Sequence, residues 1–117
     1  MMLRGVFLTS EQPAVTARFY REVAGLPMEQ VGESGGYVYW RLDDGRMQLA
    51  IHDAKAFSDY TFPVVRGSNA TQLYFPIEDQ QAFRARLEQL GIEPYSVDDV
   101  VVTVTDPDGR KVLFGTA

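Results

Sequence analysis

Hydrophobic and polar positions in the first half of the chain predict one helix and four strands. A strand is expected over 3–9, followed by a helix in which Val15, Phe19 and Val23 recur every four residues. Ser10 is a candidate N-cap for this helix, and Gly25 can end it in a left-handed conformation. Short β-rich runs over 28–31, 37–42 and 46–52 predict three further strands. The first half is therefore expected to fold as βαβββ.

The second half repeats this order. Strands are expected over 71–77, 93–96, 100–105 and 111–116. Between the first two, Asp79 is a candidate N-cap for a helix with a buried stripe, and Gly91 can end that helix. The pattern predicts a single α+β domain over 1–117, made of two βαβββ modules, with module 1 over about 1–53, a linker over 54–69 and module 2 over about 70–117.

Charge and residue usage narrow the function classes. The 117 residues include 16 acidic and 11 basic side chains, a formal net charge of -5, which disfavours nucleic acid and anionic membranes as partners. The absence of cysteine excludes disulfides, thiolate zinc sites and iron-sulfur clusters, and the single histidine, His52, excludes any site that needs two imidazoles from one chain. The apolar run at the N-terminus is too short for a signal peptide or a membrane span, so a cytoplasmic protein is expected.

Two segments resemble a known superfamily. Phe19-Tyr20 followed by Val23-Ala24-Gly25-Leu26, and the turn Asp106-Pro107-Asp108-Gly109 before the last strand, are similar to motifs of the vicinal oxygen chelate superfamily. That superfamily includes glyoxalase I, extradiol dioxygenases, fosfomycin-modifying enzymes and bleomycin-resistance binding proteins. The resemblance implies two half-barrels around a cup, often completed in a homodimer.

The enzymes of this superfamily hold a divalent metal with His and Glu side chains at four positions in the cup. The resemblance places these positions at Gly5, Gln48, Gln72 and Leu113. None of them is a histidine or a carboxylate, and amide oxygens are poor ligands for a catalytic transition metal. His52 alone does not replace the missing ligands. The sequence therefore predicts the fold without its metal and with no other cofactor.

Strand alternation assigns the residues that face the cup. Pairing across the turn at 43–45 is expected to set Trp40 opposite Gln48, which leaves Tyr37 and Tyr39 on the helix side or at an edge. Rings on strands also pack within sheets and dimer interfaces, so this alternative stays open. The predicted ligand-binding residues are Phe7, Trp40, Gln48, His52, Gln72, Tyr74 and Leu113.

The linker is unusually apolar for a flexible connection. Phe57, Tyr60 and Phe62 are expected to form a lid over the cup or a pad for a second subunit, and the sequence does not decide between these roles.

Three functions fit these features. The first is a metal-free homodimer that sequesters a small aromatic or cationic compound such as an antibiotic, in the manner of drug-resistance binding proteins. The second is a metal-independent lyase or isomerase that uses His52 or Tyr74 as acid or base. The third is a structural or regulatory protein whose cup is filled by its own side chains. The sequence favours binding over catalysis without excluding an enzyme.

Overall fold

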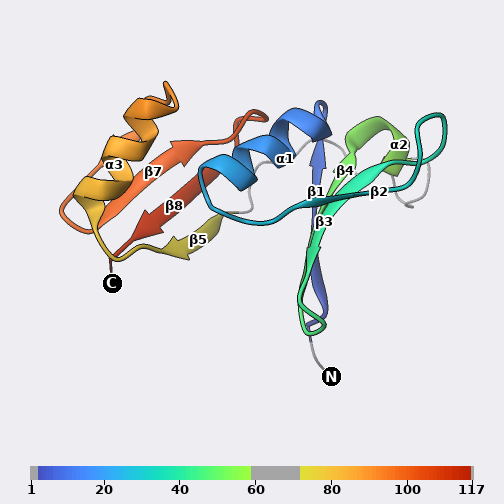
Figure 1. Ribbon diagram of the computed structural model, residues 1–117, viewed down its shortest axis with the longest axis horizontal. Helices are drawn as coiled ribbons and strands as arrows, with labels where there is room; N and C mark the ends of the chain where they lie inside the picture. Colours follow the sequence, from blue (N-terminus) through green and yellow to red (C-terminus); the bar gives the residue numbers. More distant parts are fainter. Residues whose placement is uncertain (1–2, 59–71, 117) are drawn as a thin grey trace.

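The chain folds into two four-stranded sheets, each with a helix against one face (Figure 1). The computed structural model describes residues 3–58 and 72–116. The elements of module 1 are β1 (Gly5–Ser10), α1 (Pro13–Glu22), β2 (Glu29–Val31), β3 (Tyr39–Asp43) and β4 (Gln48–Asp53), and α2 (Ala54–Ser58) follows it. Those of module 2 are β5 (Leu73–Pro76), α3 (Gln80–Gln89), β6 (Ser96–Val97), β7 (Val101–Thr105) and β8 (Lys111–Gly115). The predicted α+β fold of two βαβββ modules is confirmed.

The two sheets have the same topology. Sheet A has the strand order β1-β4-β3-β2, and sheet B has the order β5-β8-β7-β6. In each sheet the first strand of the module runs parallel to the last one, and the remaining neighbours are antiparallel. Gly45 and Gly109 have positive φ in the last turn of each module, which their missing Cβ permits. The repeat seen in the sequence is therefore a repeat of structure.

The ends and faces of the helices differ in detail from the prediction. The helix α1 begins at Pro13, and Ser10 belongs to β1, where its Oγ accepts a hydrogen bond from the Gln12 amide at 3.0 Å. Phe19 is buried as expected, but Val15 is 43% exposed, so its assignment to the buried stripe was wrong. In α3 the N-cap is confirmed, since Asp79 accepts hydrogen bonds from two backbone amides of the first turn.

A short helix, α2, occupies the start of the segment expected to be a linker. Asp53 Oδ1 accepts hydrogen bonds from the amides of Lys55 and Ala56 at 3.0 and 2.9 Å, which starts this helix directly after β4. Phe57 is therefore on a helix. Tyr60 and Phe62 lie outside the described residues.

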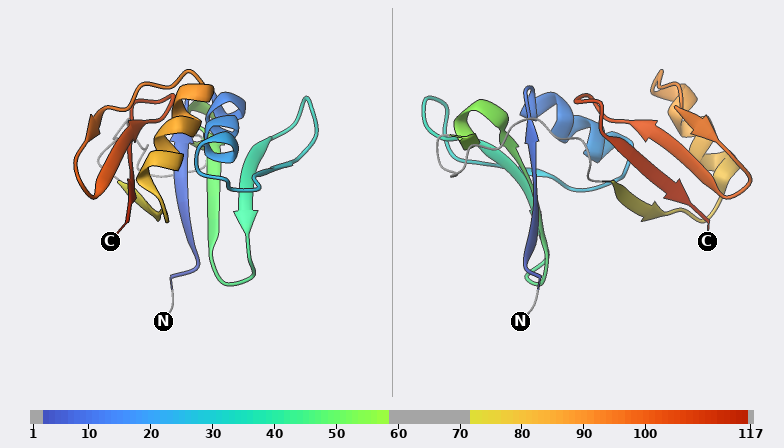
Figure 2. Two further views of the ribbon diagram at one scale, coloured as in Figure 1. Left: turned by 60° about the vertical axis from the view of Figure 1, so that its left-hand side comes forward. Right: turned by 180° about the vertical axis from the view of Figure 1, so that it is seen from behind.

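The helices of the two modules meet, and the helix-covered sides of both sheets share one core. Arg86 Nε of α3 donates a hydrogen bond of 3.1 Å to the carbonyl of Glu22 at the end of α1. Figures 1 and 2 show α1 beside the turn between β7 and β8. The core includes Leu8, Phe19, Tyr20, Ile51, Leu87, Val102, Val104, Val112 and Phe114. The opposite face of each sheet, which we call its inner face, points away from this shared core.

A buried polar network ties the β7–β8 turn to module 1. Asp106 Oδ2 accepts a hydrogen bond from Tyr20 Oη at 2.9 Å and one from Arg110 Nη1 at 2.6 Å. Arg110 Nη2 donates to the carbonyl of Thr9 at 2.8 Å. The ion pair is almost completely buried, with side-chain exposures of 3% for Arg110 and 0% for Asp106. We call Tyr20, Asp106, Arg110 and the Thr9 carbonyl the inter-module lock.

Further hydrogen bonds at the rim of the lock join the same two segments. Thr16 Oγ1 donates to Asp108 Oδ2 at 2.7 Å, and Gln12 Nε2 donates to the carbonyl of Pro107 at 2.9 Å. These contacts hold the start of α1 against the β7–β8 turn.

Neither the length nor the apolar character needed to cross a bilayer is found in any helix of residues 3–58 and 72–116.

Candidate ligand-binding site

The inner face of sheet A is defined by the register of its strands. Phe7 pairs with Ala50, Thr9 pairs with His52, and Tyr39 pairs with His52 on the other side. Because side chains alternate along each strand, paired residues share a face. The inner face of sheet A carries Gly5, Phe7, Thr9, Tyr39, Arg41, Asp43, Gln48, Ala50 and His52.

The structure corrects the expected place of Trp40. Trp40 pairs with Ile51, and Asp43 pairs with Gln48, so the hairpin register differs by three residues from the predicted one. An odd shift moves every side chain to the other face. Trp40 therefore packs on the helix side, where the guanidinium of Arg21 lies 5.3 Å from its ring centroid.

The same shift brings Tyr39 to the inner face, although Tyr37 and Tyr39 were expected on the helix side or at an edge. The turn explains the error, since Asp44 Oδ1 accepts hydrogen bonds from the amides of both Arg46 and Met47, and this lengthens the loop. The alternation of apolar and charged residues along β3 does indicate the correct faces. Trp40 and Leu42 are apolar, whereas Arg41 and Asp43 between and after them are charged.

Five aromatic rings gather at one end of the inner face of sheet A. His52 stacks on Tyr39 with ring centroids 4.6 Å apart and an interplanar angle of 12°. Phe57 of α2 lies 4.7 Å from His52, and Phe7 lies 5.2 Å from it. Tyr37 Oη and His52 Nδ1 are hydrogen-bonded at 2.7 Å. We call these five residues the aromatic cluster.

Within the aromatic cluster, His52 is a neutral side chain near neutral pH. Only 8% of its surface is exposed, and burial lowers the pKa of the imidazole below its ordinary range. The hydrogen bond to Tyr37 fixes the orientation of the ring. The predicted position of His52 on the inner face is correct, and at this end of sheet A the face is packed by the protein's own aromatic side chains.

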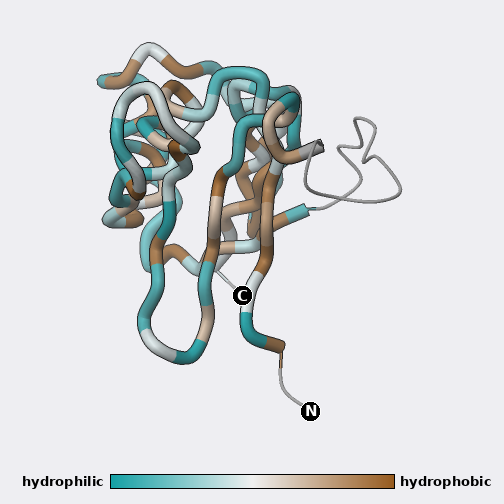
Figure 3. Tube along the Cα trace, turned by 90° about the vertical axis from the view of Figure 1, so that its right-hand side faces the viewer, coloured by the Kyte–Doolittle hydropathy of each residue, from teal (hydrophilic) through white to brown (hydrophobic). Residues whose placement is uncertain are grey.

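At the margin of the aromatic cluster the inner face of sheet A opens to solvent, and toward the β3–β4 hairpin it becomes polar. Phe7 is 54% exposed even though its ring contacts His52 and Phe57. At the far end Arg4 Nη2 and Asp43 Oδ2 form an ion pair at 2.8 Å, whose hydrogen bond lowers the pKa of Asp43. Figure 3 shows that the tip of the β3–β4 hairpin beside this pair is hydrophilic. The open surface thus begins at Phe7 and ends at a charged rim.

The inner face of sheet B carries a second exposed aromatic ring. Tyr74 pairs with Leu113 and is 47% exposed, and the hydroxyl end of its ring lies against Gly115, where a Cβ would stand 2.9 Å from its Cζ atom. Lys111 belongs to the same face, and its Nζ lies 4.3 Å from the ring centroid of Tyr95. Tyr74 and Leu113 are therefore brought together on one face, as predicted.

Gln72 is exposed and lies just before β5, outside the paired part of the sheet. The ligand-binding roles assigned to Phe7, Gln48, His52, Tyr74 and Leu113 remain predictions, as does that of Gln72.

The residues at the four superfamily metal positions do not fit a divalent metal. Gly5 pairs directly with Gln48, and a Cβ at Gly5 would lie 3.1 Å from the Gln48 carbonyl oxygen and 3.3 Å from Cε1 of Phe7. The ring of Phe7 thus crowds the place of a ligand side chain on β1. Leu113 offers no donor atom, and the described residues contain no group of three His, Cys, Asp or Glu side chains that could hold a metal.

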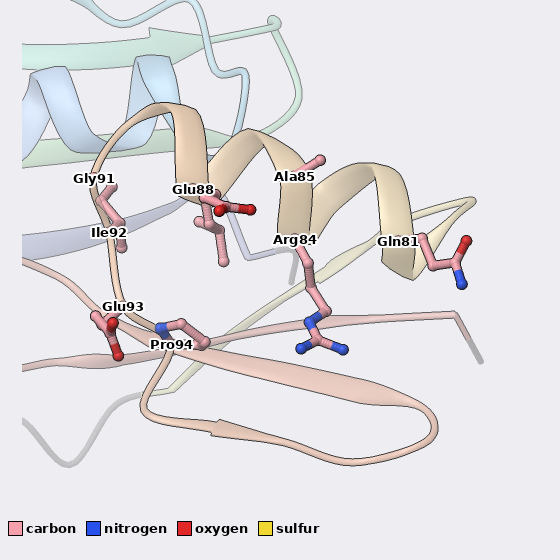
Figure 4. Close-up of a pocket in the computed structure, with 9 residues that line it drawn as sticks. Gln81, Arg84, Ala85, Glu88, Gly91, Ile92, Glu93 and Pro94 are labelled. Atoms are coloured by element: carbon pink, nitrogen blue, oxygen red, sulfur yellow. The ribbon is translucent and has the colours of Figure 1, made fainter.

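A separate hollow of about 670 Å³ lies along α3, away from both inner faces. Figure 4 shows Arg84 and Glu88 of α3 beside it, with Glu93 and Pro94 on the segment that follows the helix. Arg84, Glu88 and Glu93 are exposed to solvent. This hollow has the character of an ordinary charged helix surface.

Comparison with known proteins agrees with the geometry. The model of the glyoxalase-like domain family matches residues 5–114. No curated protein matches the chain.

Several solved structures share the fold over nearly the whole chain. Lactoylglutathione lyase from Agrobacterium tumefaciens is 22% identical, with a TM-score of 0.70 over 97% of this chain and 91% of that one. Glyoxalase I from Leishmania major is 14% identical, with a TM-score of 0.68 over 98% and 86%. An antibiotic binding protein from a Streptomyces species, TnmS3, is 16% identical, with a TM-score of 0.63 over 98% and 94%. At these identities the likeness concerns the fold.

Proposed function

The chain belongs to the glyoxalase-like domain family, and on that premise we propose that it binds a small aromatic compound, such as an antibiotic, without a metal. The observation that carries the proposal is the pair of exposed rings, Phe7 on β1 and Tyr74 on β5. They occupy the first strand of each module and face away from the core. Exposed aromatic side chains on a pleated face provide stacking area for a flat ligand.

The charges on the inner faces favour a ligand with acceptor oxygens over a cation. Arg41 on β3 and Lys111 on β8 are basic residues of the described inner faces, whereas the acidic Asp43 on β3 is already paired with Arg4. Gln48 can donate or accept a hydrogen bond, and Thr103 pairs with Leu113 on the inner face of sheet B. A quinone or polyketide ring system, with several carbonyl or phenolic oxygens, matches this set better than an aliphatic amine.

A second copy of the chain would complete the cup. The two inner faces of one chain point away from their shared core and do not close on each other. The radius of gyration is 15.0 Å, larger than the about 13 Å expected for a compact chain of this length. A two-fold homodimer would place sheet A of one protomer against sheet B of its partner and would cover both Phe7 and Tyr74.

One observation favours a second function, that of a metal-independent lyase or isomerase. The hydrogen bond between Tyr37 and His52 and the lowered pKa of His52 give a neutral, oriented imidazole, which is what general-base catalysis at neutral pH requires. Against this stands the packing of the ring by the aromatic cluster. Recovery of the ligand after incubation separates the two functions, because a binding protein returns it unchanged.

The test is a binding screen in the presence of a chelator. Quinone, anthracycline, bleomycin and planar peptide antibiotics would be titrated by calorimetry and by thermal melting. A compound present at 100 times its Kd should stabilise the chain by about 2.7 kcal/mol. Phe7→Ala and Tyr74→Ala should each weaken binding about tenfold, whereas Val100→Ala, which changes an exposed apolar residue before β7, should leave it unchanged.

The proposal fails for these ligand classes if none shifts the melting temperature. It fails also if one does so and the two ring variants bind it as tightly as the original chain.

A further inference from the structure

A groove of about 830 Å³ lies on the side of sheet A opposite to its inner face. Its walls come from the start of α1, the loop before β3, and the junction between β4 and α2. The lining residues that determine the chemistry of this groove are Pro13, Val15, Tyr37, Val38, Trp40 and Asp53. This volume is in the range of small-molecule sites, about 300–1,000 Å³.

The walls of the groove are held in place by contacts outside it. Arg21 lies over the Trp40 ring at 5.3 Å and restricts the indole. The backbone at Tyr37 is held beside the groove because its ring turns to the inner face, where the hydroxyl is hydrogen-bonded to His52 at 2.7 Å. Asp53 is oriented because its Oδ1 accepts the hydrogen bonds that start α2. The groove is therefore a pre-formed surface with one oriented aromatic side chain, that of Trp40, and one oriented carboxylate, that of Asp53.

Charge distinguishes this groove from the inner faces. Among the described residues that line it, Asp53 is the one with a charged side chain at neutral pH, and the remaining lining is apolar, aromatic or neutral polar. Arg21 contacts the indole ring of Trp40 but does not line the groove. The net charge of -5 adds a favourable long-range field for cations.

We infer that this groove is a second ligand site, for a planar aromatic cation. The ring system would lie along Trp40, against the apolar wall of Pro13, Val15 and Val38, with its positive charge toward Asp53. Stacking and a charge-assisted contact then act on one ligand. The inference does not depend on the proposed function, because none of the exposed rings of the inner faces lines this groove.

The test uses three tricyclic probes of similar shape and different charge. They are 9-aminoacridine, a cation at pH 8, neutral acridine, and the anion anthracene-9-carboxylate. Trp40 is the only tryptophan, so its fluorescence reports directly from the groove. The expected result is saturable quenching by 9-aminoacridine, with a Kd about tenfold lower than that of acridine and no saturable quenching by the anion.

Two matched Asp→Asn variants test whether the Asp53 carboxylate is the group that recognises the cation. Asp53→Asn keeps an oxygen that can start α2 and should abolish the preference for the cation. Asp79→Asn makes the same change at the start of α3, away from the groove, and should leave the preference intact. Val15→Lys adds a positive charge at an exposed residue that lines the groove, and it should raise the Kd for 9-aminoacridine at least tenfold.

Each contrary outcome overturns the inference. Acridine binding as tightly as 9-aminoacridine would remove the role of Asp53, and equal losses in Asp53→Asn and Asp79→Asn would show a general charge effect. Calorimetric binding that survives Val15→Lys but is lost in Phe7→Ala and Tyr74→Ala would move the cation to the inner faces.

Discussion

Tyr20 in α1 donates a buried hydrogen bond of 2.9 Å to Asp106, which lies 86 positions further along the chain. Burial and the neighbouring carboxylate raise the pKa of Tyr20, so the hydroxyl stays protonated and donates at every physiological pH. Tyr20→Phe should lower the free energy of unfolding by about 1.5–3 kcal/mol, the usual cost of a hydrogen bond to a charged group. Urea unfolding measures this loss. Tyr95→Phe, at a 63% exposed residue, is the matched control and should change little.

The two Asp-Gly-Arg turns should respond very differently to the same substitution. Arg110 is 3% exposed and paired with Asp106, whereas Arg46 is exposed on the β3–β4 turn. Arg110→Met leaves a buried carboxylate without its counter-charge and should cost about 3–5 kcal/mol. Arg46→Met should stay within about 0.5 kcal/mol, as surface substitutions usually do. Similar losses in the two variants, measured by urea unfolding, would contradict the role of the inter-module lock.

Gly115 should be essential for the position of Tyr74. A Cβ at this residue would overlap the Tyr74 hydroxyl and stand 2.9 Å from Cζ, so Gly115→Ala must displace the ring. Because Tyr74 is 47% exposed and its ring can swing toward solvent, we expect a loss of no more than about 1 kcal/mol, together with weaker binding of any ligand that uses Tyr74. Adding Tyr74→Ala to Gly115→Ala removes the clash and should restore stability without restoring binding. Melting curves of the four combinations measure the coupling, and additive effects would show that the two residues act independently.

His52 should make the folded state sensitive to mild acid. Because burial lowers the pKa of His52, the unfolded chain binds its proton more readily than the folded chain does. The stability linked to His52 is complete above the ordinary pKa of about 6.5 and is lost as the pH falls through the range below it, until the folded pKa is reached. The side chains packed around the imidazole are the aromatic rings of Phe7, Tyr37, Tyr39 and Phe57.

Urea unfolding between pH 7.5 and pH 5 tests this dependence. The original chain should lose stability with a slope of up to about 1.4 kcal/mol per pH unit beyond that of His52→Gln, in which this titration is absent. Parallel pH profiles for the two proteins would show that His52 titrates equally in the folded and unfolded chains.

Chelators should not change ligand binding or stability. Gly5 and Leu113 supply no donor atom, and the Phe7 ring lies against the place of a side chain at Gly5. Melting temperature and ligand Kd should therefore be the same with and without excess EDTA, and a zinc titration should show no saturable heat. Loss of ligand binding on chelation, reversed by a stoichiometric divalent metal, is the outcome that would refute a metal-independent site.

The fold could be predicted from the sequence because local signals agree with it at every level. The glycines that end both helices, the Asp79 cap and the turn glycines Gly45 and Gly109 all specify the same order of elements. The faces of β4, β5 and β8 also follow from alternation, and Ile51, Phe75 and Phe114 pack on the core side as expected.

The candidate site was less predictable because it depends on one hairpin register. Trp40 was expected opposite Gln48, but the two side-chain hydrogen bonds of Asp44 lengthen the turn and bring Asp43 there instead. A shift of three residues exchanges Trp40 for Tyr39 on the inner face. The sequence left open whether Phe57 covers the cup or a second subunit, and in the structure its ring lies 4.7 Å from His52. The short helix that carries Phe57 was not predicted, since nothing in the 54–58 segment distinguishes a helix from a linker until Asp53 is seen to cap it.

The inter-module lock also determines what a separated half of the chain would look like. A fragment that begins after α2 would keep Asp106 and Arg110 but lose Tyr20 and the Thr9 carbonyl, so a charged pair would sit on an apolar surface that α1 no longer covers. The complementary fragment would expose Phe19 and Tyr20 in the same way. The two halves would then bind each other through the apolar surfaces that the separation exposes. Although the two modules have the same fold, they therefore behave as one folding unit. The chain could be divided between them to make a split reporter of association.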